Sequence, residues 1–176
     1  YANAAIVISI DHQKHFANDL MGGMKMRREL EQKALSAVRA RGGSKELPAQ
    51  TVMNFMNDRT AMSAQTTLPG SSPSGTMAVS LNQIMPKFMS QKIREGLQVF
   101  DVKMKGFLSE KAQLYGVESR TSCPVRVTRN NDTLESTSHK GLYPCGEGAG
   151  YAGGITSAAC DGIAVAESIC RELSKA

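Results

Sequence analysis

The chain has 176 residues, of which 41% are hydrophobic and 21% are charged, a composition that is ordinary for a soluble globular protein. This length allows one domain with a substantial core or two small lobes. The formal net charge of +5 is spread among acids, and with 5% aromatic residues and no Trp the chain lacks a basic, stacking surface for nucleic acid.

The sequence carries no targeting or membrane signal. There is no signal peptide and no apolar run of about 18 residues, so we expect a cytoplasmic protein without a membrane span. The chain opens at Tyr1 and passes directly into an apolar stretch, whereas a natural start would supply Met. We therefore expect a fragment or a processed piece of a longer polypeptide.

The cysteines and histidines do not predict a metal site. The cysteines lack C-x-x-C spacing and fall in predicted strands or helices, so we expect buried, reduced thiols. Only Cys123 lies in a polar loop, where a redox role is the alternative. The histidines lie in polar stretches without metal-ligand spacing. The residues concerned are Cys123, Cys145, Cys160, Cys170, His12, His15 and His139.

The first third of the chain predicts a strand followed by helices. Ala4 to Ile10 is a nearly continuous apolar run, which is typical of a strand buried on both faces. After a polar segment, residues 24–41 have the apolar spacing of a helix and stop at a pair of glycines. Pro48 then predicts the start of a short helix that ends near Asn57.

The middle of the chain predicts a long loop, a helix and two strands. Residues 58–80 are rich in Pro, Gly and Ser, and such long loops either serve a function or are mobile. Pro86 suits the first turn of a helix whose apolar residues keep helical spacing to about Leu108. Strands are predicted next, over residues 114–120 and 125–129.

The C-terminal stretch predicts a strand, a turn and a long helix. Leu142 to Cys145 reads as a short buried strand, and a helix runs from Ile155 to about Ser174. Small and apolar residues recur there at steps of three and four, which places them on one helical face. We expect this face to pack on a sheet that contains both Ala4 to Ile10 and Leu142 to Cys145. The residues of the face are Ile155, Ala159, Ile163, Ala166, Cys170 and Leu173.

Five glycines crowd the nine residues between that strand and that helix: Gly146, Gly148, Gly150, Gly153 and Gly154. One or two glycines would satisfy a tight turn, so this density indicates close approach of a ligand. Exposed N–H groups at a helix N-terminus bind anions or polarised oxygens. Residues 148–153 spell G-x-G-x-x-G, but the second strand and acid of a dinucleotide fingerprint do not follow. No Lys-Ser or Lys-Thr follows the glycines as in a Walker-type phosphate loop.

The run from Thr137 to Glu147, T-S-H-K-G-L-Y-P-C-G-E, resembles the last FAD signature of flavoproteins with two dinucleotide-binding folds. Its continuation, G-L-Y-P-C-G-E-G-A-G-Y-A-G-G-I followed by S-A-A-C-D-G, is similar to a bacterial family of FAD-dependent dehydrogenases. Further similarities lie at residues 1–10, 27–34, 47–50 and 116–127, so the resemblance spans nearly the whole chain.

The resemblance implies FAD as the cofactor and a role for the glycine turn that begins at Gly146. Glu147 would accept a hydrogen bond from a ribityl hydroxyl, since a carboxylate carries no competing donor. The backbone N–H groups around Gly153, Gly154 and Ile155 would face the N1 and O2 edge of the flavin. The positive end of the helix would there stabilise the anionic, reduced cofactor.

A second cluster lies in residues 119–124, which the resemblance implies to be near the isoalloxazine ring. Ser122 would belong to the cofactor site. Arg120 would either orient an acidic substrate or lie near the flavin, and a surface ion pair is the alternative. By the same resemblance, the loop 58–80 either lines the substrate side of the flavin or is a mobile surface loop.

The resemblance also implies a domain organisation of the α/β class. Residues 1–10 and 113–176 would be the last elements of a Rossmann-like FAD-binding domain, and residues 11–112 a mainly helical inserted lobe on the substrate side. In the isolated fragment this combination is of the α+β kind. The strand, glycine loop and helix that would hold the ADP part of FAD would lie upstream.

We therefore expect the C-terminal fragment of an FAD-dependent oxidoreductase, catalytically incomplete alone, with the remaining N-terminal part of the parent polypeptide as its partner. NAD(P)H is a candidate electron donor and a homo-oligomer stays open, while the small-molecule substrate and any general acid or base are unassigned. The alternatives are a non-enzymatic module that binds anions or nucleotides through the glycine loop, and a purely structural or protein-binding domain.

Overall fold

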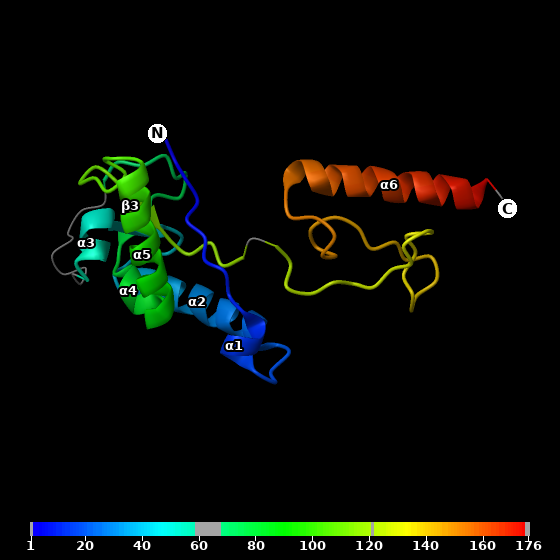
Figure 1. The fold of residues 1–176 in the computed structure, drawn as a ribbon, viewed down its shortest axis with the longest axis horizontal. Coiled ribbons are helices and arrows are strands. Elements are labelled where there is room, and N and C mark those ends of the chain that lie inside the picture. The colour runs from blue at the N-terminus through cyan, green and yellow to red at the C-terminus, as the bar shows by residue number, and fades with distance from the viewer. Residues whose placement is uncertain (1, 59–67, 121, 175–176) are drawn as a thin grey trace. The chain divides into compact units, whose positions relative to one another are not determined.

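The structure is a computed structural model that describes residues 2–58, 68–120 and 122–174. The chain divides into two compact units, Tyr1–Ser119 and Arg120–Ala176. Figure 1 follows the N-terminal unit in blue to green and the C-terminal unit in yellow to red. Among the described helices, none has the length and apolar character that a membrane crossing requires.

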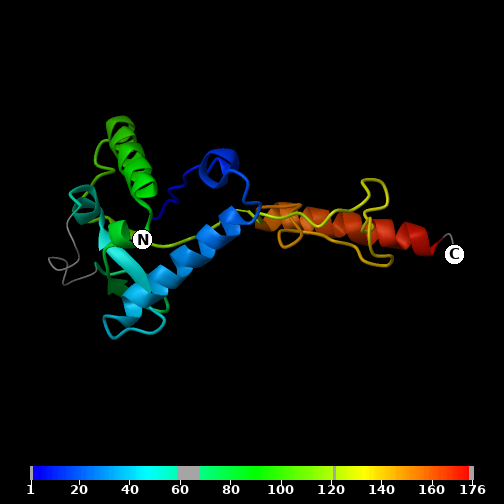
Figure 2. The same cartoon turned by 90° about the horizontal axis from the view of Figure 1, so that it is seen from below.

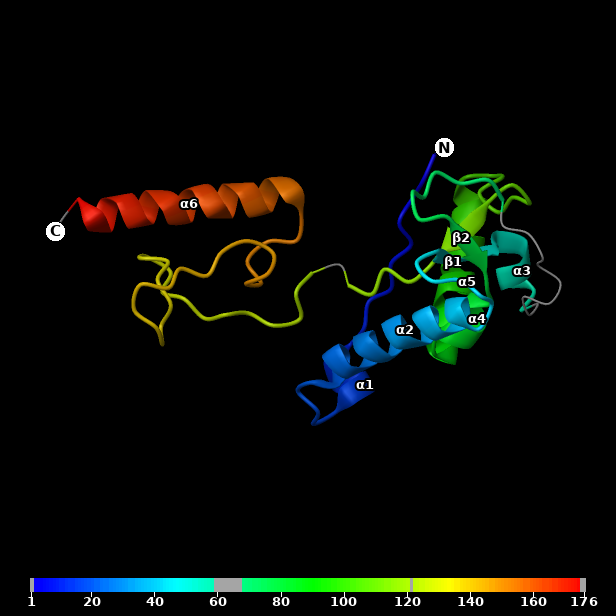
Figure 3. The same cartoon turned by 180° about the vertical axis from the view of Figure 1, so that it is seen from behind.

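A small mixed sheet lies at the centre of the N-terminal unit. Its strands are β1 (Leu47–Thr51), β2 (Thr76–Ala78) and β3 (Gln113–Tyr115), in the order β2-β1-β3. β1 is parallel to β2, its neighbour in Figure 3, and antiparallel to β3. The combination of helices with a three-stranded sheet agrees with the predicted α/β class at this coarse level.

The helices of this unit are α1 (His12–Phe16), α2 (Gly22–Arg39), α3 (Val52–Met56), α4 (Leu81–Ile84) and α5 (Lys87–Lys103). The predicted helices over residues 24–41 and from Pro86 onward are confirmed as α2 and α5. The second ends earlier than expected, because Asp101 Oδ1 accepts from the N–H groups of Gly106 (3.1 Å) and Leu108 (2.9 Å) and turns the chain there.

The predicted helix from Pro48 to Asn57 is only partly right. Its first residues form the central strand β1, and the helix begins at Val52. Thr51 caps α3 by accepting from the Asn54 N–H at 3.4 Å, which is a common way to start a helix. Pro48 tolerates its place in the strand because its carbonyl, not its missing N–H, bonds Gly116 N at 3.0 Å.

The hydrophobic core of the N-terminal unit lies between the sheet and helices α2 to α5. Helix α2 runs past the strands in Figure 2 and contacts both β1 and α4. A buried glutamine is part of this interior, since Gln50 on β1 accepts from the Leu81 N–H at 2.9 Å and so fixes the start of α4. The core cluster consists of Ala34, Val52, Phe55, Val79, Leu81, Ile84 and Leu97.

Several predicted strands do not form. Ala4 to Ile10 is extended but belongs to no strand, and Val7 is 68% exposed, so the expected strand buried on both faces is wrong for this chain. Residues 142–145 are not a strand either, so the sheet predicted to join the two segments is absent from the described residues. An extended segment becomes a strand only when another strand pairs with its amide groups.

The remaining strand predictions also shift. The strand expected over residues 114–120 is reduced to β3, and residues 125–129 make only an isolated bridge between Arg129 and Ser136. β2 lies inside the segment 58–80 that was predicted as a loop. Residues 59–67 of that segment lie outside the described residues.

The C-terminal unit consists of an irregular segment, residues 122–154, that packs along α6 (Ile155–Leu173). The predicted helix is confirmed, but the predicted packing of its apolar face is wrong for this chain. Ile155 is 93% and Leu173 is 72% exposed. The other side of α6 is buried instead, at Val165 and at Ser168, whose hydroxyl donates to the Thr133 carbonyl at 2.7 Å.

The cysteines are free, but they are not buried as expected. Cys145, Cys160 and Cys170 are exposed, and Cys123 is half-buried. Two of the exposed thiols, Cys160 and Cys170, lie on α6 away from its packed side, which explains the difference.

The core assignment predicts a contrast within α5. Leu97 is 1% exposed and Val102 is 80% exposed. Leu97→Ala should lower the free energy of unfolding by about 2–5 kcal/mol, because it removes buried methyl groups and leaves a cavity. Val102→Ala should change it by less than about 0.5 kcal/mol. Urea titrations of both variants measure this difference, and equal midpoints would contradict the assigned core.

Candidate functional site

The glycine loop, residues 146–154, begins with two linked turns. The Gly150 N–H donates to the Glu147 carbonyl and the Tyr151 N–H donates to the Gly146 carbonyl, both at 3.0 Å. Gly150 has a φ of +82°, and a Cβ there would lie 2.5 Å from the Val125 carbonyl oxygen. The fold itself therefore requires glycine at this position.

Two other glycines of the loop have no such requirement. Gly148 lacks a positive φ, and a Cβ built there meets no atom within 4 Å. Gly154 has an extended φ of −149°, and its Cβ would meet only the Ser157 hydroxyl at 3.7 Å. Among the described residues of the C-terminal unit, no packed atom requires glycine at these two positions. A group that approaches the backbone from outside would explain them.

The N-terminus of α6 presents unpaired N–H groups next to these glycines. Gly154 is the N-cap, and Ser157 closes the first turn by accepting from the Gly154 N–H (3.1 Å) and donating to its carbonyl (3.0 Å). The N–H groups of Ile155, Thr156 and Ser157 have no acceptor among the described residues. Ile155 is 93% exposed, so the positive end of this helix of 19 residues is open to a ligand.

An ion pair that is mostly shielded from solvent lies at the start of the glycine loop. Arg129 Nη2 is 2.6 Å from Asp161 Oδ1 and Nη1 is 3.0 Å from Oδ2, a bidentate arrangement. The side chains are 8% and 15% exposed. Arg129 also donates to the Pro144 carbonyl at 2.7 Å, and Asp161 accepts from the Gly146 N–H at 2.8 Å. The pair therefore joins α6 to the first residues of the loop.

An aromatic ring covers this ion pair. The Arg129 guanidinium carbon lies 3.6 Å from the centroid of the Tyr151 ring, and that of Arg126 lies 4.9 Å from it. The Tyr151 hydroxyl donates to the Val127 carbonyl at 3.0 Å. Tyr151 thus fixes the second half of the loop over the ion pair.

Hydrogen bonding and burial act in opposite directions on the ionisation of the pair. The bond from Arg129 holds the pKa of Asp161 below its ordinary value of 3.8, the Gly146 N–H adds to this effect, and burial opposes it. The same hydrogen bonds, which Asp161 accepts, raise the pKa of Arg129. Both groups are therefore charged at neutral pH.

The structure brings some of the predicted site residues together. Gly146, Glu147, Gly153, Gly154 and Ile155 belong to one loop and the helix that follows it. Arg120 Nη2 lies 3.8 Å from Glu147 Oε1, and both side chains are almost half exposed. This contact is the surface ion pair that was the alternative for Arg120. An exposed pair of this kind contributes little stability and leaves both groups available.

Ser122 and Cys123 have weaker connections to the glycine loop than Arg120 has. Ser122 is exposed. The Cys123 thiol donates weakly to the Gly148 carbonyl at 3.5 Å, which brings the polar loop 122–124 to the glycine loop. The part of the chain that the structure describes contains no cluster of His, Cys, Asp and Glu with the makings of a metal site.

Sequence reasoning missed Arg129, Asp161 and Tyr151. Asp161 lies on α6 within the S-A-A-C-D-G motif, and its position off the apolar face is the only signal that it packs on something polar. Arg129 was predicted only as the last residue of a strand, so its partner 32 residues further on could not be foreseen.

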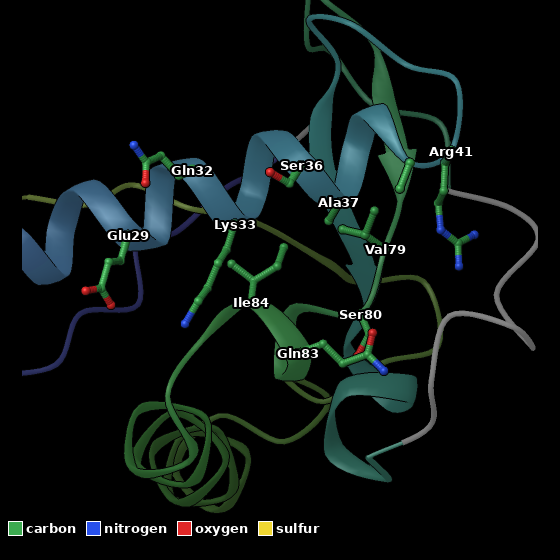
Figure 4. A pocket seen from close by; sticks show the side chains of 11 residues that line it. Glu29, Gln32, Lys33, Ser36, Ala37, Arg41, Val79, Ser80, Gln83 and Ile84 are labelled. Carbon is green, nitrogen blue, oxygen red and sulfur yellow. The ribbon is translucent and has the colours of Figure 1, made fainter.

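A separate hollow of about 630 Å³ lies in the N-terminal unit between α2, the end of β2 and α4. Figure 4 shows that polar side chains, including Lys33, Ser36 and Gln83, surround it together with Ala37, Val79 and Ile84. None of the predicted site residues lines this hollow. The residues that line it include no glycine, so the glycine loop is the stronger candidate for a cofactor.

Comparison with known proteins bears on the cofactor. The family described as "FAD-dependent protein, C-terminal domain-like" matches residues 1–121. The chain belongs to this FAD-dependent protein family. The match covers the N-terminal unit and ends before the glycine loop.

A relative matches almost the whole of this chain. A protein of Clostridium beijerinckii, described only as an uncharacterized protein, is 41% identical over 168 residues, which are 96% of this chain and 31% of that protein. The chain thus spans about a third of the length of the curated relative that it matches. That length of match takes in most of both units.

The residues of the glycine loop fit part of an FAD molecule. Free N–H groups at the start of α6 suit the oxygen- and nitrogen-rich edge of a flavin, and Glu147 suits a hydroxyl donor. The open space above Gly148 and Gly154 leaves their backbone accessible. The donor set of the loop therefore agrees with the cofactor of the family.

The lowered pKa of Asp161 predicts how the loop responds to acid. A carboxyl whose pKa is depressed by folding stabilises the folded unit above its unfolded pKa, and this contribution is lost as the pH falls through the folded pKa. The amide proton of Gly146, which is bonded to Asp161, should therefore titrate with a midpoint below 3.8 in an NMR pH series. Asp161→Asn should remove this transition. A midpoint at or above 3.8 would contradict the buried, charged pair.

Proposed function

We propose that this chain contributes the flavin side of the FAD site in an FAD-dependent oxidoreductase of the dehydrogenase type. The observation that carries the proposal is the glycine loop. It presents unpaired N–H groups at the start of α6 and glycines that the local packing does not require, in a chain of an FAD-dependent family. The match of family and donor set favours this function over an anion-binding or structural module.

Each part of the loop has a chemical role in this proposal. The N–H groups of Gly153 and Ile155 would donate to the pyrimidine edge of the flavin, and the positive helix end would favour negative charge there. The Gly154 N–H is bonded to the Ser157 hydroxyl at 3.1 Å, so Gly154 would contribute a close approach of its backbone instead. Glu147 would accept from a ribityl hydroxyl, with Arg120 holding its carboxylate in place at 3.8 Å. Ser122 would lie at the edge of the same site. When bound, the flavin supplies the hydride or electron transfer.

The proposed site is completed by other parts of a longer protein. The relative from Clostridium beijerinckii is about three times the length of the segment that matches it, which leaves room for the elements that bind the ADP part of FAD. In that longer protein, residues 1–10 and 113–176 would belong to the FAD-binding domain and residues 11–112 to an inserted lobe on the substrate side. Reduced nicotinamide stays a candidate electron donor without an assigned residue.

Glu147 provides the most direct test. In the longer protein, Glu147→Ala should weaken FAD binding by about 1.5–3 kcal/mol, the contribution of a hydrogen bond to a charged group. The measurement is flavin content per protein after desalting, supported by a titration with FAD. Glu167→Ala is the matched control, because it removes an exposed carboxylate from α6 away from the loop. Equal flavin content in both variants would remove Glu147 from the site.

If the FAD site is formed by several parts of a longer protein, this chain alone should not retain FAD. Residues 1–176 should purify without colour, because the elements that hold the pyrophosphate of FAD are supplied elsewhere. Affinity falls tenfold for each loss of about 1.4 kcal/mol, so the flavin side alone should not retain FAD. Visible absorbance in the flavin band after gel filtration checks this. A stoichiometric flavin band would show that this chain, or a dimer of it, is sufficient.

A further inference from the structure

The glycine loop has no regular secondary structure, yet side chains hold the backbone in and next to it at three places. Arg129 donates to the Pro144 carbonyl at 2.7 Å, just before the loop. Asp161 accepts from the Gly146 N–H at 2.8 Å, where the loop begins. Arg126 Nε donates to the Gly150 carbonyl at 2.9 Å, in its middle. Together these contacts determine where the loop lies relative to α6, the helix that carries Asp161.

Other groups of the loop and of the first turn of α6 have no bonding partner among the described residues. The N–H groups of Ile155 and Thr156 have no acceptor among the described residues, and Gly148 faces open space. Glu147 touches only the exposed Arg120 through its carboxylate among the contacts of the described residues. The groups that anchor the loop and the groups that are available to a ligand are therefore different ones within one short segment.

We propose that Arg129 and Asp161 are positioning residues for the cofactor, and that their ion pair sets the distance between the glycine loop and the N-terminal N–H groups of α6. This inference rests on the function proposed above, since it concerns the same site. In this proposal the pair would not contact the cofactor itself. It acts through Pro144 and Gly146, and Tyr151 covers it at 3.6 Å from the guanidinium.

The physical reason is the bidentate geometry of the bonds between Arg129 and Asp161. A planar guanidinium that meets both oxygens of one carboxylate has little freedom to slide or rotate, unlike an ammonium group. Nη1 of this guanidinium bonds both Asp161 Oδ2 and the Pro144 carbonyl, so the position of Pro144 is tied to that of the ion pair. A buried pair of this kind contributes specificity of geometry more readily than net stability.

Asp161→Asn in the longer protein tests the inference. Asparagine keeps the size of the side chain and an oxygen for the Gly146 N–H, but it leaves the Arg129 charge buried without a partner. We expect FAD to bind about tenfold more weakly or worse, which corresponds to about 1.4 kcal/mol. We also expect the visible absorption band of the flavin that remains bound to shift, because the N–H donors around it have moved.

Ser168→Ala is the matched control. It removes another buried anchor of the same unit, the bond from the Ser168 hydroxyl to the Thr133 carbonyl, at a place far along α6 from the glycine loop. It should lower thermal stability while leaving the FAD affinity and the flavin band unchanged. If it weakens FAD binding as much as Asp161→Asn does, the pair has only a structural role and the inference is overturned.

A milder pair of variants keeps the test informative if Asp161→Asn fails to fold. Tyr151→Phe removes only the bond to the Val127 carbonyl and retains the ring over Arg129, so it should shift the flavin band slightly. Arg129→Lys keeps the positive charge and should therefore perturb folding less than Asp161→Asn does. Its affinity for FAD should nevertheless stay below that of the unmodified protein. An unchanged band in both would refute the inference. Absence of FAD from the unmodified longer protein would instead overturn the proposed function, and the inference with it.

Discussion

The C-terminal unit depends on the ion pair between Arg129 and Asp161. This unit has one helix and an irregular segment of more than thirty residues, so regular secondary structure cannot by itself determine where the segment lies on α6. The pair joins α6 to the irregular segment, because it is bonded to the Pro144 carbonyl and to the Gly146 N–H at the start of the glycine loop. Removing one partner would leave a buried charge, which costs far more than an exposed ion pair contributes.

The loop around this pair separates two kinds of glycine. Gly150 is required by the fold, because a Cβ would collide with the Val125 carbonyl. Gly148 and Gly154 meet no such obstacle, so their cost in backbone entropy is compensated by something other than local packing. This distinction supports a ligand at the loop more strongly than the number of glycines does, since a count cannot tell structural glycines from accessible ones.

Helix α6 has two different sides, and the structure uses the less obvious one. Its apolar side, which includes Ile155 and Ile163, is exposed, with Ile163 at 60%. The side with Asp161, Val165 and Ser168 packs on the irregular segment through polar contacts and one buried valine. The irregular segment has carbonyl and N–H groups that no sheet pairs, and polar side chains of α6 can bond them. This explains why the polar side of α6, and not its apolar side, faces the segment.

The sequence by itself determined the helices α2, α5 and α6, the family, and the loop that is the candidate site. Periodicity of apolar residues, prolines and glycine pairs are local signals, so they survive in any tertiary context. It misassigned Ala4 to Ile10, residues 142–145 and the start of α3, because a strand exists only where another strand pairs with it. Only the tertiary structure decided that Arg129 meets Asp161 across 32 residues and that Gln50 fixes α4 from β1. Contacts between distant residues leave no periodic trace in the chain, and these contacts hold the candidate site in place.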